Sequence, residues 1–258
     1  MVVLDLSRYD IQTFNVHCFK DNGVESVILA SFKENEMRAC AEQCQAVGLP
    51  IIGFYGFIYF GNSFGETRDT LAAIRLAQEF NISRVWIDSE VDADPSTNGF
   101  TLDYTPTSTS RVQVIHKCVD LVEGSGLEAG IYTGSWWWPS GTNRSTAFSH
   151  LPLWNSYYDQ DPDIDGLPYG GWTTAAIEQY SSTYNICGRK RDVNYVYEED
   201  EMTPEQQYKL DAVYNALCAG DKTVIDSWNT NGNSMILGYN KLFNTTTKLA
   251  EAAGINIE

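Results

Sequence analysis

The chain has 258 residues and a formal net charge of −17, from 34 acidic and 17 basic side chains. Proteins that bind nucleic acid need Lys and Arg to neutralise phosphates, so this charge argues against a nucleic-acid partner. No run of about 18 apolar residues occurs, and we therefore expect no membrane span. Residues 1–4 are apolar but lead directly into Asp5, so we expect no signal peptide and synthesis in the cytoplasm.

Short apolar runs predict eight β-strands, and helical periodicity lies among the first five of them. The strands are expected at residues 2–7, 27–30, 51–55, 84–88, 130–132, 151–154, 175–180 and 192–195. Apolar residues at three- and four-residue spacing predict helices within 37–47, 67–77 and 112–122. Thr67 is the expected cap of the second helix, and residues 92–105 are expected to form a long polar loop.

The alternation of strands and helices indicates a parallel α/β fold. About eight strands within roughly 200 residues favour a closed barrel, in which the site lies at the C-terminal ends of the strands. Side chains suited to sugar chemistry fall at these predicted ends: the acids Asp5, Asp88 and Glu90, and the aromatics Tyr55, Tyr132 and Trp154. The last three strands are expected to be joined by loops.

Asp88 and Glu90 follow an apolar run and are two residues apart. On a strand they share one face, where mutual repulsion raises the pKa of one of them. A protonated acid beside an ionised carboxylate suits cleavage of a glycosidic bond. The alternative is a strand end whose acids are solvated or paired with bases. Their common position with Asp5 at one end of a barrel favours the catalytic interpretation.

The six cysteines, at positions 18, 40, 44, 118, 187 and 218, predict buried free thiols. Cys40 and Cys44 share a face of a predicted helix, but no histidine or second cysteine pair lies nearby in the sequence. A zinc site is therefore not expected. We predict no metal and no cofactor.

Seven short segments occur in the order found in one enzyme family. They are Asp5-Leu6-Ser7, Gly53-Phe54-Tyr55, Trp86-Ile87-Asp88-Ser89-Glu90, Ala129-Gly130-Ile131-Tyr132-Thr133, Pro152-Leu153-Trp154, Gln179-Tyr180-Ser181 and Asp192-Val193-Asn194. Through them, residues 2–197 resemble the glycoside hydrolase family 25 lysozymes, which are N-acetylmuramidases. The likeness is to bacteriophage endolysins or tail lysins and to bacterial autolysins.

This resemblance implies an irregular TIM-like (β/α)5(β)3 barrel over residues 1–199, with a small helical segment at 200–258. It implies hydrolysis of the β-1,4 bond between N-acetylmuramic acid and N-acetylglucosamine in bacterial peptidoglycan. The enzyme would act at the cell wall, either released at lysis or carried on a virion.

The resemblance also assigns roles to individual residues. Glu90 matches the general acid, and Asp88 matches the carboxylate that assists the 2-acetamido group of the substrate. Asp5 and Asp192 match the outer acids of the site, although Asp192 would equally suit a turn. The candidate sugar contacts, for which core packing is the alternative role, are Tyr55, Tyr132, Trp154, Gln179 and Tyr180.

Two positions depart from the family pattern: Gly56 replaces a usual histidine, and Glu178 replaces a usual aromatic residue. Both are expected near the site, where a fifth acid would alter the pKa values of the others. The alternative function is a catalytically weak domain that binds the cell wall or builds a virion. A chitinase-type barrel is excluded, because Trp86 and Ser83 stand where that class has aspartates.

Residues 200–258 are expected to contain two helices. The first begins at Thr203-Pro204-Glu205 and ends at Gly220, after the acidic run at 198–201. The second carries an apolar stripe between Ile236 and Ala253. Two such helices bury little alone, so they either pack against the barrel or mediate self-association.

Overall fold

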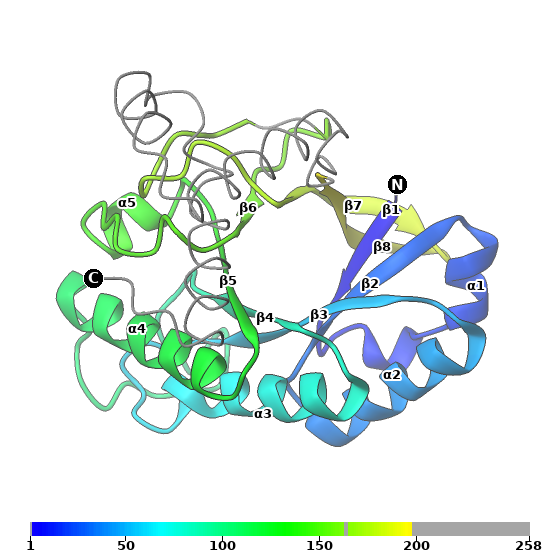
Figure 1. Cartoon of the computed structure of the whole chain (residues 1–258), viewed down its shortest axis with the longest axis horizontal. Helices are drawn as coiled ribbons and strands as arrows, with labels where there is room; N and C mark the ends of the chain where they lie inside the picture. Colours follow the sequence, from blue (N-terminus) through cyan, green and yellow to red (C-terminus); the bar gives the residue numbers. More distant parts are fainter. Residues whose placement is uncertain (1, 163–164, 198–258) are drawn as a thin grey trace, which may run out of the picture. The chain divides into compact units, whose positions relative to one another are not determined.

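The computed structural model describes residues 2–162 and 165–197, which contain a closed eight-stranded barrel (Figure 1). Each strand pairs with the next in the sequence, and the last pairs with the first. The strands are β1 Val2–Leu6, β2 Val24–Ala30, β3 Ile51–Phe57, β4 Arg84–Asp88, β5 Glu128–Thr133, β6 Leu153–Ser156, β7 Ile177–Ile186 and β8 Arg189–Val196. The boundary predicted at residue 199 and the helices predicted beyond it lie outside the described residues.

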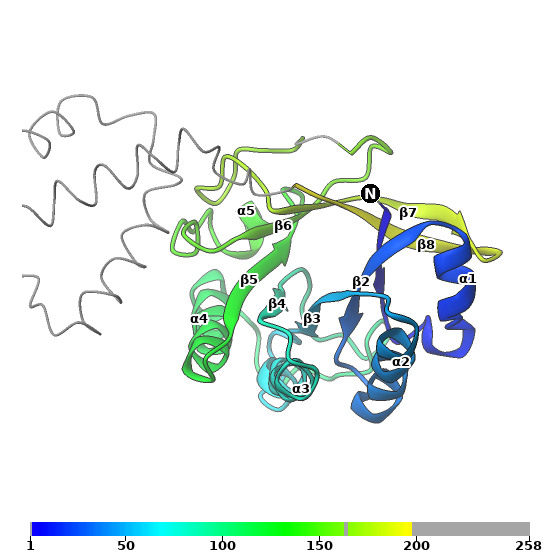
Figure 2. The ribbon, with the colours of Figure 1, turned by 45° about the vertical axis from the view of Figure 1, so that its right-hand side comes forward.

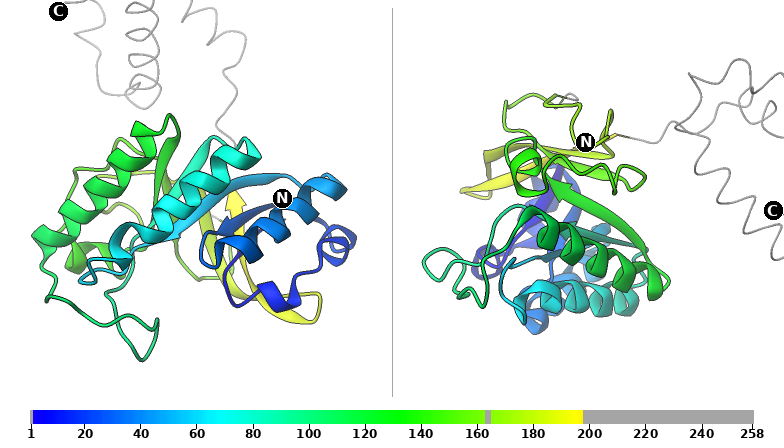
Figure 3. Two further views of the ribbon diagram at one scale, coloured as in Figure 1. Left: turned by 90° about the horizontal axis from the view of Figure 1, so that it is seen from below. Right: turned by 90° about the vertical axis from the view of Figure 1, so that its left-hand side faces the viewer.

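Helices lie between the early strands and cover the outside of that part of the barrel. They are α1 Val16–Asp21, α2 Glu34–Val47, α3 Gly65–Phe80, α4 Ser108–Gly124 and the single turn α5 Trp138–Gly141, with a 3-10 helix at Ile11–Thr13. Figure 3 shows α2, α3 and α4 side by side on the outer surface. The sixth to eighth strands are joined by loops and a hairpin, so the predicted (β/α)5(β)3 architecture is confirmed.

The direction of the last strand differs from the parallel sheet that was predicted. β8 runs antiparallel to both β7 and β1, whereas the other neighbouring pairs are parallel. Only Cys187 and Gly188 separate β7 from β8, and both have positive φ angles of 55° and 71°. Two such residues form a tight hairpin turn, which can join only antiparallel strands.

Bulky side chains fill the interior of the barrel below the C-terminal ends of its parallel strands. The buried residues of this cluster are Val3, Ile28, Trp86, Tyr132, Trp154 and Ile177. Trp86 fits because glycine occupies positions 53 and 130 beside it. A Cβ atom at Gly53 would lie 2.8 Å from the indole, and one at Gly130 would lie 2.5 Å from it. The two glycines therefore make room for a large ring, and polar groups gather above it.

The start of α3 was predicted incorrectly. The helix begins at Gly65, whose N–H donates to the side-chain oxygen of Asn62 at 2.7 Å, so Thr67 lies inside the first turn. α1, α5 and the 3-10 helix were not predicted, because each is too short to show a clear period. Among residues 2–162 and 165–197, none of the helices has the length and hydrophobicity of a membrane span.

A disulfide joins α1 to the hairpin turn of β7 and β8. Cys18 and Cys187 are 169 residues apart in the sequence, and their Cα atoms lie 6.1 Å apart. Figure 2 shows α1 beside this hairpin. The prediction of buried free thiols is confirmed for Cys40, Cys44 and Cys118 and is wrong for the bonded pair. Cys218 lies outside the described residues.

Removing this disulfide should lower the free energy of unfolding substantially. A loop of this length contributes about 5 kcal/mol in the chain-entropy model, and measured losses are commonly about 2–5 kcal/mol. We expect denaturant unfolding of the Cys18→Ser, Cys187→Ser double variant to show such a loss. Reductant should destabilise the natural protein and have little further effect on the double variant. Equal stability of the two proteins under oxidising conditions would contradict this.

Candidate active site

Four carboxyl groups meet at the carboxyl end of the parallel strands. Asp5 of β1 and Asp192 of β8 are directly paired across the antiparallel ladder. Asp88 is the last residue of β4, and Glu90 follows two residues later. Only 4% of Asp5 and 5% of Asp88 is exposed to solvent. The four predicted acids are therefore neighbours, and two of them are buried.

Two side-chain amides hold Asp5. Its Oδ2 accepts from Nε2 of Gln179 and from Nδ2 of Asn194, each at 2.8 Å. Oε1 of Gln179 accepts from the hydroxyls of Tyr132 at 2.7 Å and Tyr158 at 2.5 Å. Because Gln179 has acceptor bonds on one side and a donor bond on the other, its amide orientation is determined by this network.

The second amide is fixed in the same way. Oδ1 of Asn194 accepts from the indole N–H of Trp154 at 2.7 Å, so its Nδ2 is directed to Asp5. Trp154 is only 1% exposed, and its ring contacts Tyr55 edge-on at 5.8 Å and Tyr132 at 4.6 Å. The rings of Trp154, Tyr55 and Tyr132 fill the barrel directly beneath the carboxylates, and we call them the barrel floor.

The predicted sugar contacts therefore fall into distinct groups. Tyr132, Trp154 and Gln179 are buried and bonded within the network, so they position Asp5 and support the floor. Tyr55 is half-buried among them and lies close enough to Asp5 and Asp88 for their charges to raise the pKa of its hydroxyl, after the larger effect of burial. Tyr180 is not part of this group, because it packs against the hydrophobic layer outside the barrel.

One oxygen of Asp88 is left without a donor. Its Oδ1 is buried and accepts no hydrogen bond from the described residues. A buried acceptor without a partner costs about 1–3 kcal/mol, and more when it is charged. An N–H group on a bound ligand would satisfy this oxygen.

Burial raises the pKa of all four acids. The pKa rises to about 6 for Asp5, to about 7 for Glu90 and to about 8 for Asp192. In each case the main cause is loss of solvent, and the negative charge of Asp5 raises the other two further. The pKa of Asp88 is also raised well above its usual value by burial and then by repulsion from Glu90 and Asp5. The cluster therefore retains protons near neutral pH.

The two departures from the family pattern do not reach these acids. A Cβ atom at Gly56 would lie 2.5 Å from the backbone nitrogen of Thr70, so glycine allows α3 to pack closely on β3. Glu178 alternates with Gln179 along β7 and faces out of the barrel. There it is fully buried and accepts from Tyr197 at 2.7 Å. The expectation that Glu178 joins the site is wrong.

Asn194 and Tyr158 are site residues that the sequence analysis missed. Asn194 had a usable signal, because it follows Asp192 by two residues on a predicted strand and so shares its face. Tyr158 had none, because it lies in the long segment between β6 and β7, whose path depends on tertiary contacts.

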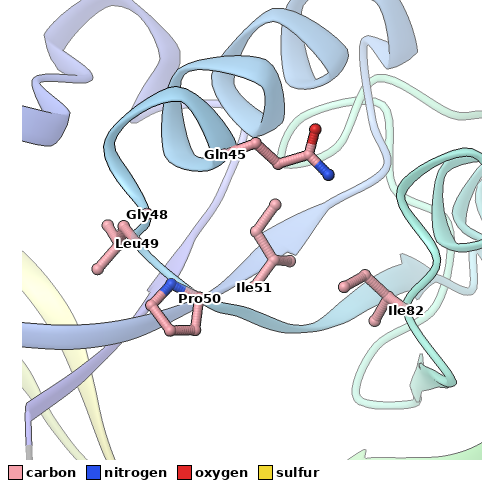
Figure 4. Close-up of a pocket in the computed structure, with 6 residues that line it drawn as sticks. All are labelled: Gln45, Gly48, Leu49, Pro50, Ile51 and Ile82. Atoms are coloured by element: carbon pink, nitrogen blue, oxygen red, sulfur yellow. The ribbon is translucent and has the colours of Figure 1, made fainter.

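A separate hollow of about 330 Å³ lies where β3 begins, at the other end of the barrel (Figure 4). It is lined by Gln45, Gly48, Leu49, Pro50, Ile51 and Ile82. None of these residues carries an ionisable side chain. The hollow lacks acid–base groups, so the chemistry belongs to the carboxylate end.

Known proteins resemble this chain in both sequence and fold. "Probable GH family 25 lysozyme 3" of Dictyostelium discoideum is 31% identical over 113 residues, covering 43% of this chain and 22% of that protein. "Probable GH family 25 lysozyme 2" of the same organism is 27% identical over 136 residues, covering 52% and 59%. The matches therefore span less than two thirds of these relatives.

A muramidase from Trichobolus zukalii has the same fold. Its structure superposes with a TM-score of 0.58 at 19% identity, covering 78% of this chain and 95% of that one. The model of the family described as "Glycosyl hydrolases family 25" matches residues 4–189, which include three of the four clustered acids and both glycines beside Trp86. The chain belongs to glycosyl hydrolases family 25.

Proposed function

We propose that the protein is a muramidase that cleaves the β-1,4 bond between N-acetylmuramic acid and N-acetylglucosamine in bacterial peptidoglycan. The observation that carries this proposal is the unpartnered buried oxygen of Asp88 beside a proton-holding Glu90. A 2-acetamido N–H is the donor that this oxygen lacks. Family membership supports the same substrate.

In the first step, Glu90 donates its proton to the glycosidic oxygen as the bond to the anomeric carbon breaks. The acetamido carbonyl oxygen of the substrate forms a bond to that carbon, and positive charge develops on the acetamido group. Asp88 accepts the acetamido N–H and stabilises this charge. Water then attacks the anomeric carbon, the acetamido oxygen leaves it, and the Glu90 carboxylate takes the proton of the water.

Asp5 and Asp192 act on the charge balance of the site in this proposal. The negative charge of Asp5 raises the pKa of Glu90, which keeps the acid protonated. Gln179 and Asn194 keep Asp5 in place by their hydrogen bonds. Tyr55, which is half-buried beside the acids, is the proposed sugar contact of the barrel floor.

The clustering of all four acids favours an enzyme over the alternative of a catalytically weak wall-binding or virion domain.

The Cys18–Cys187 disulfide favours action in an oxidising compartment outside the cytoplasm. Two expectations stay predictions. They are a role at lysis or on a virion, and self-association through residues 200–258.

Digestion of purified peptidoglycan tests the proposal. We expect loss of turbidity, with N-acetylmuramic acid at the new reducing ends identified by mass spectrometry. New reducing ends of N-acetylglucosamine would indicate the opposite bond specificity. Free amino groups on stem peptides, without new reducing ends, would contradict a glycosidase.

The rate should fall as the pH rises through about 7, because Glu90 then loses the proton that it must donate. In this proposal the acetamido N–H of the bound substrate donates to Oδ1 of Asp88 and so lowers the raised pKa of that carboxyl. On the acidic side, activity should fall when Asp88 becomes protonated, so that the profile is a bell. The measurement is kcat, which reports the ionisations of the enzyme with substrate bound, on a soluble glycan fragment between about pH 4 and pH 9. In Asp5→Asn, the residual activity should decline at a lower pH than in the natural protein. The negative charge of Asp5, which raises the pKa of Glu90, is absent from this variant. A rate that climbs steadily into alkaline pH would refute the assignment.

A further inference from the structure

Arginines and aromatic rings extend from the carboxylates over the neighbouring loops. We define the arginine shelf as Arg8, Phe32, Tyr59, Arg68 and Phe100. Its link to the site is Phe57, which pairs in register with Asp88 across β3 and β4. The ring of Phe57 lies 4.7 Å from Tyr59, which in turn lies 4.1 Å from Phe100.

Arg68 is the internal cation of the shelf. Its guanidinium lies 4.6 to 5.9 Å from the centres of four rings, which are Phe32, Tyr59, Phe64 and Phe100. Its Nε donates to Asp69 at 2.6 Å, and that carboxylate is buried. The charge of Arg68 is therefore balanced within the protein, and this residue organises the rings around it.

Arg8 is the outer cation, and its charge is not balanced in this way. It lies 4.7 Å from the ring centre of Phe32 and 4.7 Å from that of Tyr9, whose hydroxyl accepts from it. Tyr9 is 72% exposed. Within residues 2–162 and 165–197, Arg8 makes no ion pair with an acid.

Both guanidinium groups lie near the single ring of Phe32, at 4.7 and 5.0 Å. Two cations on one ring repel each other. Asp69 forms its direct ion pair with Arg68, and it attracts Arg8 only at longer range. An anion bound at Arg8 would reduce this repulsion. A planar guanidinium that is held against aromatic faces is suited to binding a carboxylate through two parallel hydrogen bonds.

We propose that Arg8 on the arginine shelf binds a carboxylate of the glycan strand next to the bond that is cleaved. The inference rests on the proposed muramidase function and adds a specificity residue to it. N-acetylmuramic acid carries a lactyl carboxyl group that N-acetylglucosamine lacks, and stem peptides add further carboxylates. A protein with a net charge of −17 repels such a polymer, so a local cation is needed to hold it.

Binding to the Glu90→Gln variant tests the inference, because the oligosaccharide is then not consumed. The probes are a peptide-free tetrasaccharide of alternating N-acetylglucosamine and N-acetylmuramic acid, its amidated form without charge, and the same tetrasaccharide with stem peptides. Titration calorimetry gives the Kd of each probe. Adding Arg8→Gln should raise the Kd of the charged probes about fivefold and remove most of its dependence on salt.

The control is Lys117→Gln in the same background, which removes one exposed positive charge from α4. It should leave the Kd of the charged probes unchanged. The amidated probe should bind equally to the variants with and without Arg8, which also shows that Arg8→Gln folds. A loss on the peptide-free probe identifies the lactyl carboxylate as the ligand, whereas a loss confined to the peptide-bearing probe identifies the stem.

Two outcomes would overturn the inference. One is an unchanged Kd of both charged probes in Arg8→Gln, and the other is an equal loss on the amidated probe. In either case, release of muramic acid reducing ends by the natural protein would leave the proposed function standing. Failure of every probe to bind, together with no release of such ends, would reject both.

Discussion

Replacing Glu90 by Gln should lower the hydrolysis of purified peptidoglycan by about a thousandfold. The substitution keeps the shape of the side chain but removes the proton that goes to the leaving oxygen, and general acids contribute about 10²- to 10⁴-fold. Burial raises the pKa of Glu90 to about 7, so the natural side chain is protonated in a large fraction of molecules at neutral pH. The amide cannot donate a proton in this way at any pH.

Glu178→Gln is a matched control for this experiment. Glu178 is also a buried glutamate, its pKa is also raised to about 7 by burial, and it lies on the outer face of β7. Its bond from Tyr197 can be kept by the amide oxygen, and the long contact of its other oxygen with Nδ2 of Asn155, at 3.4 Å, is the one that is lost. We expect the control to retain most of the activity, measured as release of reducing ends. If Glu90→Gln retained most of its activity as well, Glu90 would not be the acid.

Replacing Asp88 by Asn should lower kcat by about 10² to 10³. The carboxylate is proposed to stabilise positive charge on the acetamido group, and a neutral amide does this poorly. The expected loss is in kcat on a soluble glycan fragment, because the charge develops only in the transition state. The isosteric change should leave the fold intact, which circular dichroism can verify.

Asp120→Asn serves as the control for loss of an aspartate. Asp120 is exposed on the last turns of α4. It should hydrolyse the fragment at the natural rate. A loss of less than about tenfold in Asp88→Asn, combined with a severe loss in Asp5→Asn, would transfer the stabilising role to Asp5.

Much of the barrel could be predicted because strands and helices leave local patterns. The apolar run that ends at Asp88 is a strand in the structure, as predicted. The errors occur where a local pattern is weak or absent. α1 has only six residues, and α3 is started by Asn62, which lies three residues before the helix. Such boundaries depend on contacts with residues outside the helix, and the spacing of apolar residues within the helix does not reveal them.

The candidate site was predicted in part for the same reason. Asp5, Asp88 and Glu90 stand at the ends of local patterns, so a barrel brings them together. Gln179 was assigned to the sugar, but its amide is occupied by Asp5 and two tyrosines. No sequence pattern shows which groups will occupy this amide, because its partners come from two other strands and a loop that are distant along the chain.

The sequence by itself determined the sites of most strands and helices and the spacing of Asp88 and Glu90, because these depend on neighbours along the chain. Tertiary structure decided the rest. β8 runs antiparallel to β1, and this direction places Asp192, in the middle of β8, directly across from Asp5. The same closure of the barrel brings Cys187 to Cys18. It also removes water from the carboxylates, and burial is the main cause of their raised pKa values. These effects require groups far apart in the sequence to meet, and only the folded chain brings them together.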